Sequence, residues 1–139
     1  MNEPKKWASI TGLVLHSVIA ALMLIAGSMK VLGLVPAESL ADLGVIGQRI
    51  GLIGMGEIIT AILLVIPRTA SLGILLASAF WGGTICFHMS RGESYLMQSA
   101  LLLLTWVGAY LRIPAMFNSF WSSPAGSSRV GESPEAAMR

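Results

Sequence analysis

Four long apolar stretches constrain this chain more than any other feature. They cover residues 8–33, 47–66, 69–88 and 94–113, and few charged residues interrupt them. Roughly 20 helical residues cross the ~30 Å hydrocarbon core of a bilayer, because each residue advances a helix by about 1.5 Å. The pattern predicts an all-α fold, a polytopic membrane four-helix bundle contained in residues 1–113.

The composition agrees with a surface that faces lipid. Hydrophobic residues make up 55% of the chain and charged residues only 12%, whereas an ordinary soluble domain is about 25% charged. A net charge of +2 gives no basic patch, so nucleic acid is not an expected partner. The single cysteine, Cys86, excludes an internal disulfide and a CxxC motif. The first expected partner is therefore the lipid bilayer, and a water-soluble enzyme is not expected.

Helix-breaking residues fall where the spans should end. Pro36, Pro67 and Pro114 lie beyond or between the apolar stretches. Residues 36–43 begin with proline and carry an early acid, which predicts a short interfacial helix between the first two spans. Residues 114–139 contain aromatic residues followed by many Ser, Pro, Gly and charged residues, so we expect a mostly disordered cytoplasmic tail.

The distribution of basic residues predicts the orientation. Four spans place both termini on one side, unless the first stretch is a cleaved signal peptide, and its apolar run is longer than the usual 7–15 residues. Lys and Arg favour the cytoplasmic side of a membrane. Six lie on the side of the termini (Lys5, Lys6, Arg68, Arg112, Arg129, Arg139) and three lie opposite (Lys30, Arg49, Arg91). We expect an integral membrane protein with both termini in the cytoplasm, and in a bacterium this membrane would be the cytoplasmic (inner) membrane.

Each span carries small and polar residues along one helical face, which indicates the faces that pack together. By the rise per residue, Glu57 lies roughly 15 Å from the outer boundary and His16 lies about 12 Å from the cytoplasmic one, so the two share a depth. The outer third holds most of the other polar residues. The sequence therefore predicts an outer polar pocket with a carboxylate at its floor, and its candidate residues are Glu57, His16, Lys30, Arg49, Trp81, His88 and Gln98.

Structural roles for the same residues stay open. Glu57 could form a structural ion pair with His16 or Lys30, and basic residues near an interface can extend to water without any function. His16 and His88 lie in opposite halves of the membrane, so no metal site is expected. No nucleotide-binding loop, nucleophile elbow or other cofactor motif is evident, and no catalytic residue can be assigned.

Several short motifs resemble those of the DoxX-like family of small membrane proteins. Gly27-Ser-Met-Lys30-Val-Leu-Gly33 is similar to the G-x-x-K-L-x-G ending of its first span, with Val31 where the family often has leucine. The run from Arg49 to Glu57 and the proline-bearing turn near Pro67 resemble its second span. The resemblance covers residues 8–113 and implies a four-helix bundle in which Lys30, Arg49 and Glu57 match recurrent charged positions.

The resemblance implies an association with membrane redox systems and assigns no particular reaction. The family takes its name from a subunit associated with a terminal quinol oxidase and thiosulfate:quinone oxidoreductase, and other members are linked to thiol and oxidative-stress systems. One hypothesis is thus an accessory or binding subunit of a membrane redox complex, with a quinone as candidate cofactor. Glu57 would handle a proton, Lys30 and Arg49 would hold an oxygen atom, and Trp81 would stack on the ring.

Two other functions remain open from the sequence. The chain could be a non-catalytic assembly module whose glycine faces bind other membrane proteins, or a small transporter subunit that forms a path as a homo-oligomer. The assembly module needs no bound cofactor.

Overall fold

The computed structural model describes residues 3–121, and these residues are helical throughout apart from short connections. No strand occurs within this part of the chain, which confirms the predicted all-α class. The helices are α1 (Glu3–Val31), α2 (Ala37–Asp42), α3 (Val45–Gln48), α4 (Ile50–Val65), α5 (Ala70–Ser90), α6 (Leu96–Arg112) and α7 (Ala115–Trp121).

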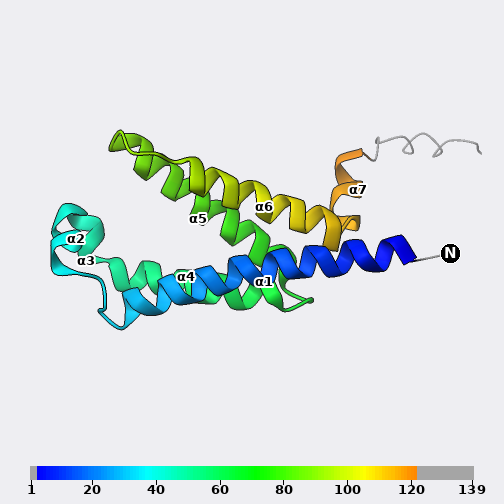
Figure 1. Cartoon of the computed structure of the whole chain (residues 1–139), viewed down its shortest axis with the longest axis horizontal. Helices are drawn as coiled ribbons and strands as arrows, with labels where there is room; N and C mark the ends of the chain where they lie inside the picture. The colour runs from blue at the N-terminus through cyan, green and yellow to red at the C-terminus, as the bar shows by residue number, and fades with distance from the viewer. Residues whose placement is uncertain (1–2, 122–139) are drawn as a thin grey trace, which may run out of the picture.

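The four long helices pack in a ring. α1 contacts α4 and α6, and α5 contacts the same two helices from the opposite side. Figure 1 shows α1 and α4 in one layer and α5 and α6 in a second layer. The layers meet near α7 and separate toward α2 and α3, and the start of α1 lies at the same end as α7 (Figure 1). We call these two ends of the bundle the α7 end and the α2–α3 end.

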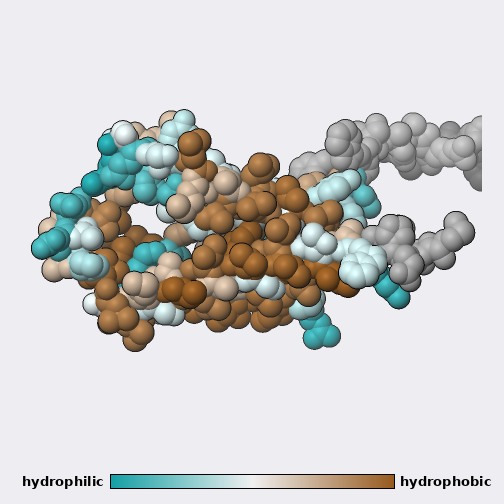
Figure 2. All heavy atoms as spheres, in the orientation of Figure 1, coloured by the Kyte–Doolittle hydropathy of each residue, from teal (hydrophilic) through white to brown (hydrophobic). Residues whose placement is uncertain are grey.

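The exterior of the molecule is more apolar than that of a soluble bundle. Large apolar side chains face outward on every long helix, as at Leu52, Leu75 and Leu103, each more than 60% exposed. In contrast, His16 and Glu57 are almost completely buried. Figure 2 shows apolar residues over most of the visible face and hydrophilic residues gathered near α2, α3 and the α5–α6 turn. An apolar exterior of this size is suited to lipid contact.

Two helices are long and apolar enough to cross a membrane. They are α1, from Lys6 to Val31, and α5, from Ala70 to Ser90. The other two long helices are apolar but have only 16 and 17 residues, which corresponds to about 24–26 Å of helix against a ~30 Å hydrocarbon core. That α4 and α6 also cross the membrane stays a prediction.

The helix bounds differ from the expected spans at several ends. α1 starts at Glu3, before the expected residue 8, and α5 continues to Ser90 instead of ending at residue 88. The second span was expected to begin at residue 47, but α4 begins at Ile50 because Arg49 (φ −108°, ψ 11°) separates it from α3.

Two short helices, α3 and α7, lie outside the helices expected from the sequence. The short helix expected at residues 36–43 is α2 (Ala37–Asp42), and a second short helix, α3, follows it after Gly44, where φ is +57°. Helix α7 (Ala115–Trp121) forms the aromatic start of the expected tail, residues 114–139, whose predicted disorder stays a prediction. The remainder of that tail, residues 122–139, lies outside the described residues.

Glycine and proline account for the helix ends. α1 and α5 each end with a glycine of positive φ, Gly33 (+68°) and Gly92 (+69°). In both cases the next amide reaches back to the helix, from Leu34 to Met29 O and from Glu93 to His88 O, each at 2.9 Å. This is the Schellman arrangement, which glycine favours because it has no Cβ. α4 and α6 end just before Pro67 and Pro114, which disfavour helical backbone in the preceding residue.

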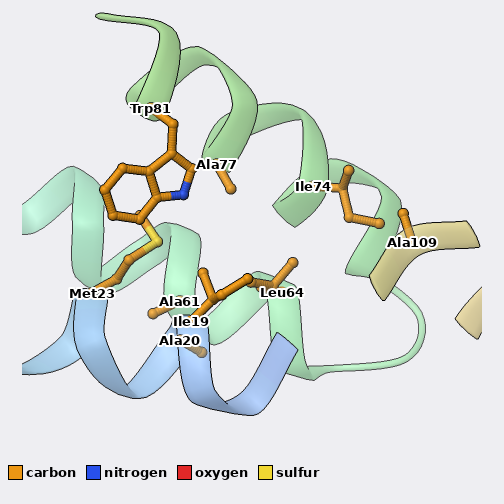
Figure 3. Close-up of a cluster of buried hydrophobic side chains, with 9 residues drawn as sticks. All are labelled: Ile19, Ala20, Met23, Ala61, Leu64, Ile74, Ala77, Trp81 and Ala109. Atoms are coloured by element: carbon orange, nitrogen blue, oxygen red, sulfur yellow. The ribbon is translucent and has the colours of Figure 1, made fainter. Parts of the chain in front are cut away.

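The core between the two layers consists of apolar side chains, most of them small or medium in size. Figure 3 shows nine of them, with Trp81 lying over Met23 and with Leu64, Ile74 and several alanines toward the α7 end. The α1 and α4 backbones approach closely at Gly27 and Gly54, where an added Cβ at either position would lie 2.6–2.7 Å from the other residue's carbonyl oxygen. Small residues at such crossings are the usual way in which membrane helices pack.

Candidate functional site

An ion pair joins the last turn of α1 to the middle of α4. Lys30 follows Gly27 by about one helical turn, and Glu57 likewise follows Gly54, so the glycine contact brings the two charged side chains together. Lys30 Nζ donates a hydrogen bond to Glu57 Oε1. Of the two partners considered from sequence for Glu57, the one in contact is therefore Lys30.

The two members of this pair are buried to different degrees. The Glu57 side chain is 1% exposed, whereas that of Lys30 is 22% exposed. The second carboxylate oxygen, Glu57 Oε2, is buried and has no hydrogen-bond partner within the described residues. A buried carboxylate oxygen without a partner is costly, so this atom marks a place where another polar group would bind favourably.

The ion pair forms part of the wall of a cavity of about 400 Å³ at the α2–α3 end. Apolar and aromatic residues supply most of the other lining, and Lys30, Glu57, Thr84 and His88 supply the polar side chains. The lining comes from α1, α3, α4, α5 and the α2–α3 connection, through Lys30, Leu43, Ile46, Ile50, Ile53, Glu57, Ala79, Phe80, Gly83, Thr84, Phe87 and His88.

A second cavity, of about 310 Å³, lies beside the first and is lined by α1, α4, α5 and α6. The two cavities share four lining residues: Lys30, Glu57, Phe80 and Thr84. Figure 2 shows the molecule hollowed between its two layers, with hydrophilic side chains inside the hollow. The ion pair is thus reached from both cavities.

Trp81 and Gln98 line the second cavity. In Figure 3 the indole nitrogen of Trp81 is turned toward Ala77, and the six-membered ring points the other way. Phe80 packs edge-on against Trp81 with ring centroids 5.0 Å apart, and Lys30 Nζ lies 5.9 Å from the Phe80 ring centroid. Gln98 Oε1 is buried without a hydrogen-bond partner in the described structure.

Charged residues connect the two layers at the α2–α3 end. Arg91 donates hydrogen bonds to Asp42 O (2.8 Å) and, from Nε, to Glu93 Oε1 (2.6 Å). His88 Nδ1 lies 2.8 Å from Glu93 Oε2. The Arg91 guanidinium lowers the pKa of the Glu93 carboxyl below its usual range, and Glu93 raises the pKa of Arg91. This exposed cluster lies beside the first cavity, since His88 belongs to both.

Comparison with known proteins assigns the chain to a family. A model of the DoxX-like family matches residues 14–109. The chain belongs to the DoxX-like family. No curated protein and no solved structure matches it. Together with α1, α5 and the apolar exterior, the family match identifies a DoxX-like membrane protein. The matched segment contains Lys30, Glu57 and the lining of both cavities.

His16 lies elsewhere in the DoxX-like bundle and lines neither of these cavities. Its Nε2 donates to Thr105 O (3.0 Å), and its Nδ1 accepts from Arg112, whose Nη1 is 3.2 Å away. A ring that donates from one nitrogen and accepts at the other is neutral. Arg112 also donates to Leu64 O and Val65 O, each at 2.7 Å. These contacts connect α1, α4 and α6 at the α7 end.

From the sequence, Arg112 was counted among the basic residues on the side of the termini and was not a candidate site residue. The signal that could have found it is its helical spacing from Thr105 and Gly108, which also surround His16. Arg49, which was named, is exposed at the junction of α3 and α4 and lines neither of the two cavities. Of the seven candidates, Lys30, Glu57, Trp81, His88 and Gln98 line the cavities.

The chemistry available at the DoxX-like site is that of hydrogen bonding and charge, together with aromatic contact. Within the part of the chain that the structure describes, no group of three or more His, Cys, Asp or Glu residues is arranged to hold a metal. The wall shared by the two cavities combines a largely apolar lining with one carboxylate and one ammonium group.

Proposed function

We propose that this DoxX-like membrane protein binds a small amphipathic molecule of the quinone-like class, as an accessory subunit of a membrane redox system. The observation that carries the proposal is the Lys30–Glu57 ion pair, which lies in the wall shared by two largely apolar cavities. In the proposed topology α1, α4, α5 and α6 all cross the bilayer. Both termini are cytoplasmic, following the excess of Lys and Arg on that side.

The cavities have the character of a small-molecule site. Such sites typically measure roughly 300–1,000 Å³ and combine an apolar lining with a few polar groups that fix the orientation of the ligand. The volumes here are about 400 and 310 Å³, and the ion pair supplies the polar groups. An ion pair that served only packing would gain little over apolar residues of the same size. Its position against open space therefore supports a binding role.

The residues present fit a quinone-like ring. When bound, such a molecule would supply two-electron, two-proton redox chemistry. Lys30 would orient an oxygen atom of the ring with its remaining N–H groups, and Glu57 Oε2 would hold or accept a proton. Phe80 and Trp81 would provide aromatic contact with the ring.

Two adjacent glycines of α5 allow a matched test of this proposal. Gly83 lines the larger cavity and Gly82 lines neither cavity, and an added Cβ at each would meet no other atom within 4 Å. Gly83→Leu should fill part of the cavity and weaken binding about 10- to 100-fold, as expected for overpacking of about 1–3 kcal/mol. Gly82→Leu should bind like the wild type.

The measurement is mass spectrometry of small molecules extracted from protein purified in mild detergent. We expect a defined amphipathic molecule with the wild type and with Gly82→Leu, and its loss with Gly83→Leu. If nothing copurifies with the wild type, or if both variants retain the same molecule, the proposed binding site is wrong.

A second candidate is a non-catalytic assembly module. Gly51 and Gly56 of α4 have open space where a Cβ would be, so a partner helix could approach the backbone there. In that case Gly51→Leu should abolish crosslinking to a partner membrane protein, whereas Gly83→Leu should leave it unchanged. If crosslinking instead persists in Gly51→Leu and is lost in Gly83→Leu, the small-molecule site is favoured.

A further inference from the structure

The unused hydrogen-bonding groups around the ion pair are a matched donor and acceptor. Glu57 Oε2 is buried, has no partner in the described part of the chain, and can only accept while the carboxylate is ionised. Lys30 has three N–H groups, and Glu57 Oε1 takes one of them. The head group of a ligand at this position therefore meets a donor and an acceptor side by side.

Thr84 adds another acceptor to the same wall. Its Oγ1 donates its hydrogen to the backbone of its own helix, with Trp81 O at 2.9 Å and Phe80 O at 3.1 Å. The hydroxyl oxygen keeps its lone pairs for an external donor. Since Thr84 lines both cavities together with Glu57, the shared wall offers acceptors that a ligand lacking N–H or O–H groups would leave unsatisfied.

From this arrangement we infer that the site selects an amphiphile whose head group carries a hydroxyl, such as a phenol or hydroquinone, over the corresponding carbonyl compound. A hydroxyl can donate to Glu57 Oε2 and accept from Lys30 at the same time. A carbonyl can only accept, so Glu57 Oε2 would stay buried without a partner. This inference rests on the proposed small-molecule function and specifies the class of ligand.

The expected preference for the hydroxyl compound follows from the charge on its acceptor, Glu57 Oε2. A hydrogen bond to a charged group contributes more than a neutral one, and leaving a buried charged acceptor unsatisfied costs at least as much. We therefore expect the hydroxyl compound to bind about 10- to 100-fold more tightly than the carbonyl compound. Methylation of the hydroxyl should remove the preference, because an ether has no hydrogen to donate.

The experiment compares three probes of nearly the same shape. They are a decyl-substituted benzohydroquinone, the corresponding benzoquinone and the dimethyl ether of the hydroquinone. Binding to the full chain in lipid nanodiscs is measured by equilibrium dialysis without oxygen, with empty nanodiscs and the Gly83→Leu variant as backgrounds for partitioning into lipid. We expect the hydroquinone to bind most tightly and the other two probes to bind more weakly, with similar affinities.

A double variant tests whether the ion pair causes the preference. Lys30→Met combined with Glu57→Met replaces the pair with apolar residues of similar length, a change that buried ion pairs usually tolerate. The cavity should still bind all three probes, but their affinities should become nearly equal. A hydroquinone preference that persists in this variant would overturn the assignment to Lys30 and Glu57.

The remaining outcomes separate this inference from the proposed function. If the wild type binds all three probes equally well above both backgrounds, the cavity is a binding site and the hydroxyl preference is wrong. If no probe binds above the Gly83→Leu background, both the inference and the proposed function fail for this class of ligand.

Discussion

Removing the two members of the Lys30–Glu57 pair one at a time should have unequal effects on stability. Lys30→Met leaves a carboxylate whose side chain is 1% exposed and which has no other partner in the described structure. Loss of one member of a buried pair typically costs about 3–5 kcal/mol, because the remaining charge is neither hydrated nor paired. We expect the free energy of unfolding to fall by this amount in Lys30→Met.

Glu57→Met should cost less. The Lys30 side chain is 22% exposed and lies near the end of α1. Its flexible stem lets the ammonium group turn toward water when its partner is absent. We expect a loss of about 1–2 kcal/mol, between the values for an unpaired buried charge and for a surface ion pair. The double Met variant should lie within about 1 kcal/mol of the wild type, because no unpaired charge remains.

The assay is reversible unfolding in mixed detergent micelles, followed by circular dichroism, for the wild type, both single variants and the double variant. Leu52→Met is the control, because Leu52 is 61% exposed on the outer face of α4, and it should change stability by less than about 0.5 kcal/mol. Equal losses in the two single variants would refute the argument from unequal burial. If the double variant loses as much free energy of unfolding as the two single variants together, the two side chains are not coupled.

Two further predictions concern other parts of the bundle. Gly54→Ala should destabilise by about 1–2 kcal/mol, because the new Cβ would lie 2.6 Å from Gly27 O and the helix-propensity gain offsets only part of the overpacking. Gly56→Ala, with open space at its Cβ, should be neutral or stabilising in the same unfolding assay. The pKa of Glu93 is lowered by Arg91, so this contact stabilises the fold above the ordinary carboxyl pKa and is lost as the pH falls through the lowered value. A carboxyl NMR titration should place the Glu93 midpoint below its ordinary value and return it upward in Arg91→Gln; identical midpoints would contradict this.

The elements of the fold could be predicted because their signals are local. The apolar stretches and the prolines that end them place four long helices correctly to within a few residues. The short helix at residues 36–43 was predicted and is α2, whereas α3 was not, because it follows a turn at Gly44 whose positive φ no periodicity reveals. The late start of α4 follows from the same irregular segment, since Arg49 interrupts the helix.

The site could be predicted only in part, because the depth of a residue in the membrane does not determine which helix its side chain faces. Counting residues placed His16 and Glu57 at one depth, yet His16 faces α6, where Gly108 leaves room for its ring. An added Cβ at Gly108 would lie 2.6 Å from His16 Cδ2. Lys30 meets Glu57 because Gly27 and Gly54 bring α1 and α4 together. The rotation of each helix about its own axis is set by these interhelical contacts, which no single span encodes.

The contacts of Arg112 have a consequence for how the bundle can move. By binding the carbonyl groups of Leu64 and Val65 while holding His16, this side chain ties three helices together at the α7 end. At the other end, the hydrogen bond from Arg91 to Asp42 O is an exposed link between the layers. Exposed contacts open more readily than buried ones. We therefore expect thermal motion to widen the bundle from the α2–α3 end, while the three hydrogen bonds of Arg112 hold the α7 end together. A molecule in the proposed site would then exchange with its surroundings without breaking these bonds.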